Sequence, residues 1–272
     1  MKRIAWLLAV GLVSAAWLAQ PATAQNPQPA ATQSAAPAAT PPPAEKPAAP
    51  ALPTAREIFE HYAQAIGGRE TWQKLNTRVS RGTVRIEGVD GTNTILVYER
   101  APNQSLSLIK MANGATIRDG FDGKEGWEQN LAGAVKAVDG ARSADIRAES
   151  DFYFEVNLAR IFPHARTMGQ RTADGRLAYV VEASAPGGSL HWYYFDAETW
   201  LRFRTDVFAN PLSPTPTTIE RFDDFKDVDG IKVPFKVSAK GSGNSIDIRF
   251  TVVRHNVGIA EDEIARPASA SN

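Results

Sequence analysis

Residues 228–253 read VDGIKVPFKVSAKGSGNSIDIRFTVV, and this stretch decides the fold. Apolar side chains occupy every second position in two runs, and most positions between them are polar or charged. The apolar positions are Ile231, Val233, Phe235, Val237, Ile246, Ile248, Phe250 and Val252. Because successive side chains of a β-strand point to opposite faces, the alternation predicts two strands, each with one dry and one wet face.

The same organisation extends toward the N-terminus, where strand-like runs are separated by turn dipeptides. Asp-Gly and Asn-Gly tolerate the positive φ angles of tight two-residue turns. They occur at 90/91, 113/114, 119/120, 122/123, 139/140, 174/175 and 229/230. The runs cover approximately 79–87, 93–100, 104–111, 115–121, 124–129, 166–172, 176–184, 189–195, 200–208, 217–225, 231–239 and 245–254. About eleven or twelve strands in sequence predict one long antiparallel meander.

Helical signals precede and interrupt the strands. Residues 54–57, TARE, have the form of a capping box, and apolar residues then recur every four positions until Gly67 and Gly68. A second short helix is expected at 70–75. Residues 143–162 lack the two-residue period, and we expect one helical segment there, with a cap at Ser143 and a stop at Pro163.

These elements predict a mainly β fold with α-helices. An open sheet of this many strands tends to curl or close. We therefore expect a strongly curved antiparallel sheet of about eleven strands that closes around an N-terminal helix and a mid-chain helix, both on its concave face. The concavity is then the expected functional surface. The alternative is that the helices fill it and leave only a solid core.

The N-terminus has the pattern of an export signal. Lys2 and Arg3 precede an apolar run over 4–18, and Ala22-Thr23-Ala24 supplies the small residues of a cleavage site. We predict a signal peptide over 1–24, cleavage after Ala24 and a periplasmic location. The apolar run is shorter than the roughly 20 residues that cross a bilayer, so no permanent membrane anchor is expected. A Pro/Ala-rich disordered linker (25–53), a half-barrel domain (54–267) and a C-terminal tail (268–272) follow.

Composition excludes several classes of function. The chain has no cysteine, which removes disulfides, thiolate zinc sites, thiol nucleophiles and a lipid-modified N-terminal cysteine. Without Lys2 and Arg3, 28 basic residues stand against 30 acidic ones, and this balance argues against a nucleic-acid partner. The four histidines are far apart in sequence and have no metal-site spacing, so we expect neither a metal nor a cofactor.

The residues contain no convincing catalytic set. Ser189 and His191 are predicted to share one strand face, but no G-x-S-x-G motif surrounds the serine. Asp119 precedes a glycine and is interpreted as a turn residue. Arg202 and Arg204 are interpreted as the polar face of a strand whose other face is apolar. The chain is therefore not expected to be an enzyme.

Four stretches together resemble a known family. They are AIGGRETWQKLNTRVSRGTV (65–84), GFDGKEGW (120–127), YFDAET (194–199) and VDGIKVPF (228–235). They resemble recurring motifs of exported bacterial proteins in the outer-membrane lipoprotein-carrier superfamily, the Lol-type half-barrels. The resemblance covers about residues 54–267. It implies an incomplete antiparallel β-barrel whose concave apolar face, covered by the N-terminal and mid-chain helices, accepts acyl chains or another hydrophobic partner without catalysis or cofactor.

The leading hypothesis is therefore a soluble periplasmic protein that binds lipid or lipoprotein in a carrier-like manner. From strand alternation, the expected ligand-binding residues are Ile95, Val97, Leu106, Leu108, Trp127, Trp192, Phe203, Phe235 and Phe250. The second hypothesis is an envelope protein-interaction or stress-sensor module on the same fold. The third is an unrecognised periplasmic hydrolase, which requires His191 or His255 to meet a carboxylate and a hydroxyl in space.

Overall fold

A computed structural model describes residues 51–241 and 243–267. The predicted signal peptide, the predicted linker up to residue 50 and the predicted tail lie outside these residues. The helices are α1 (Ala55–Ala65), α2 (Arg69–Trp72), α3 (Gly140–Glu149), a 3-10 helix η1 (Phe154–Val156), α4 (Leu158–Ile161) and α5 (Glu261–Ile264). The strands are β1 (Thr77–Ile86), β2 (Val89–Arg100), β3 (Gln104–Lys110), β4 (Thr116–Asp122), β5 (Gly126–Gln129), β6 (Val135–Ala137), β7 (Arg166–Ala173), β8 (Arg176–Ala183), β9 (Leu190–Asp196), β10 (Arg202–Phe208), β11 (Thr218–Val228), β12 (Ile231–Gly241) and β13 (Asn244–His255).

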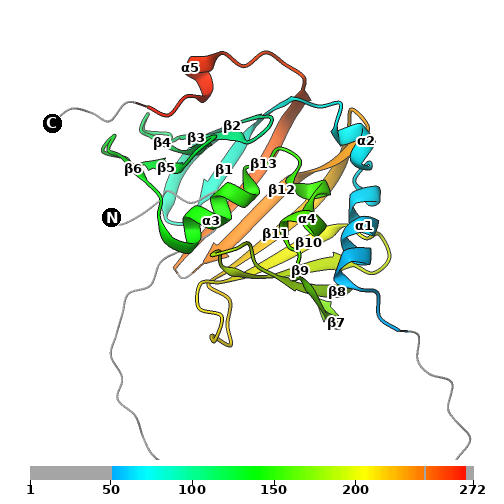
Figure 1. The fold of residues 1–272 in the computed structure, drawn as a ribbon. Coiled ribbons are helices and arrows are strands. Elements are labelled where there is room, and N and C mark those ends of the chain that lie inside the picture. The colour runs from blue at the N-terminus through cyan, green and yellow to red at the C-terminus, as the bar shows by residue number, and fades with distance from the viewer. Residues whose placement is uncertain (1–50, 242, 268–272) are drawn as a thin grey trace, which may run out of the picture. The chain divides into compact units, whose positions relative to one another are not determined.

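All thirteen strands form one open antiparallel sheet, which confirms the predicted incomplete barrel with helices. Its order is β6-β5-β4-β3-β2-β1-β13-β12-β11-β10-β9-β8-β7 (Figure 1). The sheet therefore consists of two meanders, β1–β6 and β7–β13, joined where β1 pairs with β13. This corrects the expectation of a single meander, and the short strand β6 was not predicted.

The first helix begins as its sequence predicts. The backbone N–H of Thr54 donates to Glu57 Oε2 at 2.7 Å, and the Thr54 hydroxyl accepts from the Glu57 N–H at 3.3 Å. After the helix, Gly67 has φ +112°, and a Cβ there would lie 2.4 Å from the carbonyl oxygen of Gly230. Glycine is thus required where the chain passes the β11–β12 turn.

The single helix expected over 143–162 is wrong, because this segment forms three short helices. The first begins at Gly140, so Ser143 lies inside α3. The chain then turns away from the helix axis, and the Phe152 N–H donates to the carbonyl oxygen of Pro102 at 2.9 Å. The Asp151 carboxylate accepts the Tyr153 N–H at 2.8 Å. This local bond competes with helix continuation, which explains the break.

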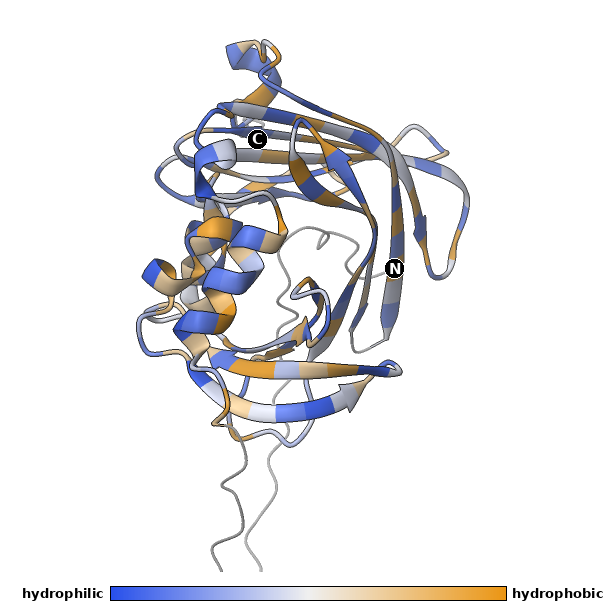
Figure 2. Ribbon diagram, turned by 90° about the vertical axis from the view of Figure 1, so that its right-hand side faces the viewer, coloured by the Kyte–Doolittle hydropathy of each residue, from blue (hydrophilic) through white to orange (hydrophobic). Residues whose placement is uncertain are grey.

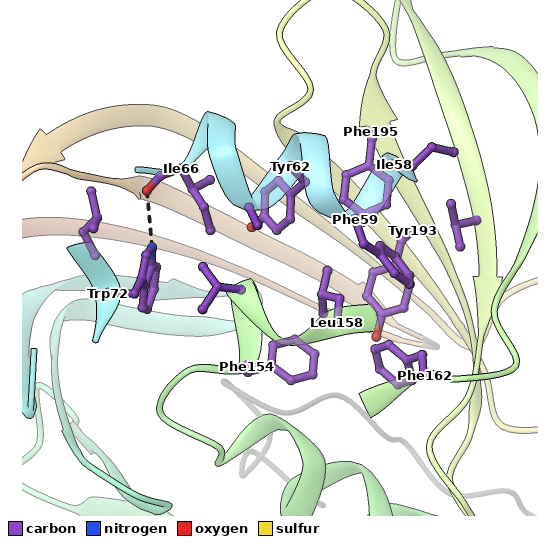
Figure 3. Packing of buried hydrophobic residues seen from close by; sticks show 14 of the residues in the cluster. Ile58, Phe59, Tyr62, Ile66, Trp72, Phe154, Leu158, Phe162, Tyr193 and Phe195 are labelled. Carbon is purple, nitrogen blue, oxygen red and sulfur yellow. Dashed lines mark hydrogen bonds between the residues drawn. The ribbon is translucent and has the colours of Figure 1, made fainter. Parts of the chain in front are cut away.

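Helices α1, α2, α3, η1 and α4 lie on the concave side of the sheet, which curves around them (Figure 2). One apolar cluster joins α1, α2, η1 and α4 to strands β8, β9 and β12. Phe59 of α1 contacts Phe195 of β9 edge to face, with ring centroids 5.8 Å apart, and the Trp72 indole N–H donates to the Ile66 carbonyl at 3.3 Å (Figure 3). Helices therefore fill this part of the concavity with solid core.

The convex side of β2 and β3 is also covered. The segment 257–264, which includes α5, lies against a cluster of Val79, Tyr98, Leu106 and Trp127, into which Ile264 inserts with 2% of its surface exposed. The Tyr98 hydroxyl donates to Glu263 at 2.9 Å. Of the helices in the described ranges, none has the length and apolar character needed to cross a membrane.

Candidate functional site: a cavity beneath α3

A cavity of about 240 Å³ remains in the other part of the concavity. Its floor is the concave face of the central strands, and α3, η1 and α1 border it from the other side. The apolar floor is continuous across strands, because Val237 is paired with Ile248 and Ala239 with Ile246. Further apolar lining residues are Val97, Phe152, Phe154, Phe222, Val233 and Phe250. The two alternatives from the sequence, an open concavity and a solid core, thus each apply to one part of the concave face.

Charged side chains also line this cavity, which the predicted apolar face did not include. Arg202 is 8% exposed, and its Nη2 donates to Glu155 Oε1 at 2.6 Å. Glu155 also accepts the Tyr62 hydroxyl at 2.7 Å. A second ion pair joins Arg78 of β1 to Glu99 of β2. These four charges are compensated within the protein.

The position of Arg202 corrects its interpretation as an outward polar residue. The pairing of β10 with β9 shifts between Arg202 and Arg204, so Arg202 is paired with Phe195 while Arg204 is paired with Tyr194. This irregularity breaks the alternation and directs the two arginines to opposite faces. Arg204 bonds Asp206 instead, at 2.6 Å from Nε to Oδ1. Only Arg202 reaches the cavity.

Four further carboxyl groups line the cavity: Asp151, which is paired with Arg160, and Asp119 from β4, Glu149 from α3 and Glu220 from β11. Burial raises the pKa of Asp119 to about 6 and that of Glu220 to about 7, and it raises the pKa of Glu149 well above its usual range. Arg142 of α3 partly opposes each of these shifts. Asp119 is not the turn residue that was expected, because it lies within β4 and is paired with Ser107.

Several polar atoms around the cavity are buried without a hydrogen-bond partner among the described residues. They include the hydroxyl of Ser107, which is 4% exposed, Nε of Arg202 and Oε2 of Glu149. The Thr205 hydroxyl, on the strand position paired with Glu220, is in the same state. Buried polar groups are normally satisfied, so these atoms indicate where a polar molecule would bind.

Helix α3 is attached to both meanders. On one side, Ile146 packs against Gly126 of β5, where a Cβ would lie 3.1 Å from the isoleucine side chain. On the other side, Asp145 Oδ1 accepts the backbone N–H of Ser189 at 2.9 Å, just before β9. A Cβ on Gly188 would lie 2.3 Å from the same oxygen. The helix thus spans the concavity and closes one side of the cavity.

The structure distributes the nine expected ligand-binding residues among several places. Val97 and Phe250 line the cavity, Ile95 packs beside Val97, and Leu106 borders the cavity while its side chain packs in the cluster under α5. The remaining five lie elsewhere: Leu108 and Trp127 in the cluster under α5, Trp192 and Phe203 in a cluster with Ala178, Val180 and Tyr194, and Phe235 in the core beneath α1.

Five of the nine residues lie elsewhere because alternation alone does not determine which face of a strand is concave. It separates the side chains of a strand into two faces, and on β3 both faces are covered, one by α3 and the other by segment 257–264. Leu106 is paired with Tyr98 and Leu108 with Leu96, so these residues share the convex face. The concave position between them is Ser107, paired with Val97. One missed signal was available: residues 142, 145, 146 and 149 of α3 have the spacing of a single helix face, and three of the four are charged.

Within residues 51–241 and 243–267, no histidine side chain hydrogen-bonds both a carboxylate and a hydroxyl, which is the combination that the hydrolase hypothesis requires. His191 Nδ1 lies 2.8 Å from the Tyr193 hydroxyl, and burial lowers the pKa of His191 to about 4. His255 Nδ1 lies 2.9 Å from Asp229 Oδ2. Over the same ranges, no group of three or more histidine and carboxylate side chains is arranged to hold a metal ion.

Known structures share this fold. A LolA superfamily protein from Nitrosomonas europaea is 11% identical, with 79% of this chain and 99% of that chain covered and a TM-score of 0.54. A DUF1329 family protein from Desulfovibrio piger is 15% identical over 77% and 96% of the two chains, with a TM-score of 0.53. A putative outer membrane lipoprotein-sorting protein domain from Vibrio parahaemolyticus is 11% identical over 76% and 94%, with a TM-score of 0.52.

No family model matches the sequence, and no curated protein is significantly similar to it. The structural matches nevertheless confirm the Lol-type resemblance of the sequence at the level of fold. At these identities, what the matches share with the chain is its architecture.

Proposed function

We propose that this protein is a periplasmic, carrier-like protein that binds acyl chains of a lipid or lipoprotein and performs no catalysis. The observation that carries the proposal is the cavity of about 240 Å³ with its continuous apolar floor on β12 and β13. The export pattern of the leader and the fold shared with a LolA superfamily protein support it. Each buried methylene would contribute about 0.8 kcal/mol, so affinity would come from the whole floor rather than one residue.

At about 240 Å³, the cavity is somewhat smaller than the roughly 300–1,000 Å³ of typical ligand pockets. A long acyl chain would therefore need extra space. Helix α3 is the element whose movement would supply it, because it is attached to the sheet by the packing of Ile146 and the Asp145 bond rather than by a strand ladder. Uptake in this proposal includes displacement of α3.

The test is ligand binding by the exported protein. Native mass spectrometry of protein purified from envelopes should show bound lipid, and the purified protein should take up a fluorescent fatty acid. Ala239→Phe, which places a ring in the cavity, should reduce uptake about tenfold or more. Ala209→Phe, in the exposed β10–β11 loop, is the matched control and should leave uptake unchanged. A lipid-free spectrum together with no uptake would contradict the proposal.

A second candidate is an envelope protein-interaction or sensor module, and the observation that favours it is the sheet edge at β7. Within the described part of the chain, β7 is paired only with β8, so its other side can accept an added strand. Gln170→Pro at this edge should then abolish capture of a partner segment and leave acyl uptake intact. Loss of acyl uptake without loss of partner capture would reject this candidate.

A further inference from the structure

We propose that the cavity selects amphiphiles whose polar end is uncharged and hydroxylated, as in a monoacylglycerol, over amphiphiles with an anionic end. The inference rests on the proposed acyl-binding function and specifies its ligand. It follows from the position, partners and charge of the polar groups that surround the apolar floor.

The polar groups converge under α3. Asp119 lies on β4 and Glu220 on β11, on opposite flanks of the central apolar strands, and Arg142 of α3 acts electrostatically on both. Glu149 extends from the last turn of the same helix. A ligand with its chain on the β12–β13 floor would therefore present its polar end to α3.

The charges at this end disfavour an anion. Glu99 and Glu155 are each bonded to an arginine, whereas Asp119, Glu149 and Glu220 share the charge of Arg142, and Oε2 of Glu149 is buried without a hydrogen-bond partner. A carboxylate or phosphate placed there would lose its own hydration in a site of low polarisability, and the one cation among these groups, Arg142, already interacts with all three carboxyl groups. The elevated pKa values of these groups show that burial already opposes their own negative charge.

The unsatisfied atoms favour a hydroxyl group. Arg202 Nε can only donate a hydrogen bond, and the Glu149 carboxylate can only accept one when ionised. A hydroxyl both donates and accepts, whereas an ammonium only donates and a carboxylate only accepts. The hydroxyl of Ser107, buried and without a partner on the cavity wall, adds a third site for such a group. These two buried side chains, Ser107 and Arg202, are independent of the carboxyl cluster.

The test compares three ligands of equal chain length: a monoacylglycerol, a fatty acid and an alkylamine. The full mature chain is mixed with equimolar amounts of all three and analysed by native mass spectrometry. We expect the monoacylglycerol complex to exceed each of the others by about tenfold. Equal binding, or preference for the fatty acid or the amine, overturns this inference but leaves acyl binding in place. Binding of none of the three overturns the proposed function itself.

Variants test which side chains determine the preference for the monoacylglycerol. In Glu149→Gln/Glu220→Gln, two carboxyl groups become neutral, so the fatty acid should gain affinity and the preference should shrink to about threefold or less. Glu198→Gln, at the exposed β9–β10 turn, is the control and should keep the full preference. If the double variant does not fold, Ser107→Ala should lower monoacylglycerol binding more than fatty-acid binding. An unchanged ratio in Ser107→Ala and in a folded double variant would place the selectivity elsewhere and overturn the inference.

Discussion

At the scale of single residues, the most informative feature is a buried guanidinium. Arg202 reaches the concave side because the β9–β10 pairing shifts beside it, and it is bonded to Glu155 of η1. The bond therefore connects the sheet to the helices that cover it. Removing one partner of a buried pair leaves the other charge without compensation, which is costlier than removing both.

Arg202→Met should lower the free energy of unfolding by about 3–5 kcal/mol, because the partly buried Glu155 would lose its ion-pair partner. Arg202→Met/Glu155→Gln should recover most of that loss. Urea unfolding of the three proteins measures both effects. Arg176→Met is the comparison, since Arg176 pairs with Asp223 at the surface, where such pairs contribute about 0–1 kcal/mol. Equal losses in the two single variants would contradict the structural role of Arg202.

Glu220 makes stability depend on pH in a defined direction. Burial raises its pKa from 4.5 to about 7, so the folded state binds its proton more tightly than the unfolded state. The contribution of Glu220 to stability is therefore largest below about pH 4.5 and is lost as pH rises toward 7. In Glu220→Gln, unfolding free energy relative to wild type should increase by about 1–3 kcal/mol between pH 5 and pH 8.

The control for this titration is Glu182→Gln. A hydrogen bond from Arg166 lowers the pKa of Glu182, so this group is ionised throughout the same pH window and its difference from wild type should be constant. Urea unfolding at each pH provides the measurement. Parallel wild-type and Glu220→Gln curves would show that Glu220 is not buried as the structure has it.

Strand alternation predicted some of the residues on the concave face correctly and placed others there that lie on the convex face. Ile95, Val97 and Phe250 lie on the concave face, as the alternation of their strands suggested. Leu108 and Trp127 do not, because segment 257–264 covers the convex face and makes apolar residues favourable there too. No local pattern on β3 reports that distant segment. The charges of the site were missed because pairing irregularities and burial are properties of the assembled sheet.

At the scale of elements, the helices differ in how well the local sequence predicts where they begin and end. The capping box predicted the start of α1 correctly, because every atom involved lies within four residues. Beyond the end of α3, a long-range contact adds to the local Asp151 bond: the Pro102 carbonyl accepts the Phe152 N–H from a loop far away in sequence. Helix α3 is also the element that the proposed uptake would displace, so its attachment can be tested directly.

Gly188→Ala should loosen α3 from β9. The new Cβ would lie 2.3 Å from Asp145 Oδ1 and would break the bond from the Ser189 N–H. Loss of one such bond should speed amide hydrogen exchange in residues 140–149 by about fivefold, with exchange in α1 unchanged. Hydrogen-exchange mass spectrometry resolves the two helices. Gly258→Ala, where a Cβ meets nothing within 4 Å, is the control. Unaltered exchange in α3 would contradict the proposed attachment.

At the scale of the whole molecule, the two meanders of the open sheet are joined at its centre, where the first strand, β1, pairs with the last, β13. Within each meander, turn dipeptides predict the neighbours of a strand, and most strand positions followed from the sequence. The β1–β13 pairing has no such signal, because alternation does not specify a partner. Gly82 shows how close this contact is: a Cβ there would lie 2.2 Å from the Arg249 carbonyl oxygen. The order of the sheet therefore had to come from three-dimensional packing.

This topology predicts the order in which the sheet forms. The β11–β12 hairpin turns at Asp229 and Gly230, whereas the Thr251 hydroxyl donates to Arg81 across 170 sequence positions. Closing the longer loop costs more entropy, so β1–β13 pairing should follow hairpin formation. Pulse-labelled hydrogen exchange during refolding should protect β11 and β12 before β1 and β13. Gly82→Ala should delay protection of β1 and β13 alone. Simultaneous protection of all four strands in wild type would mean that the central pairing is part of the folding nucleus, contrary to this prediction.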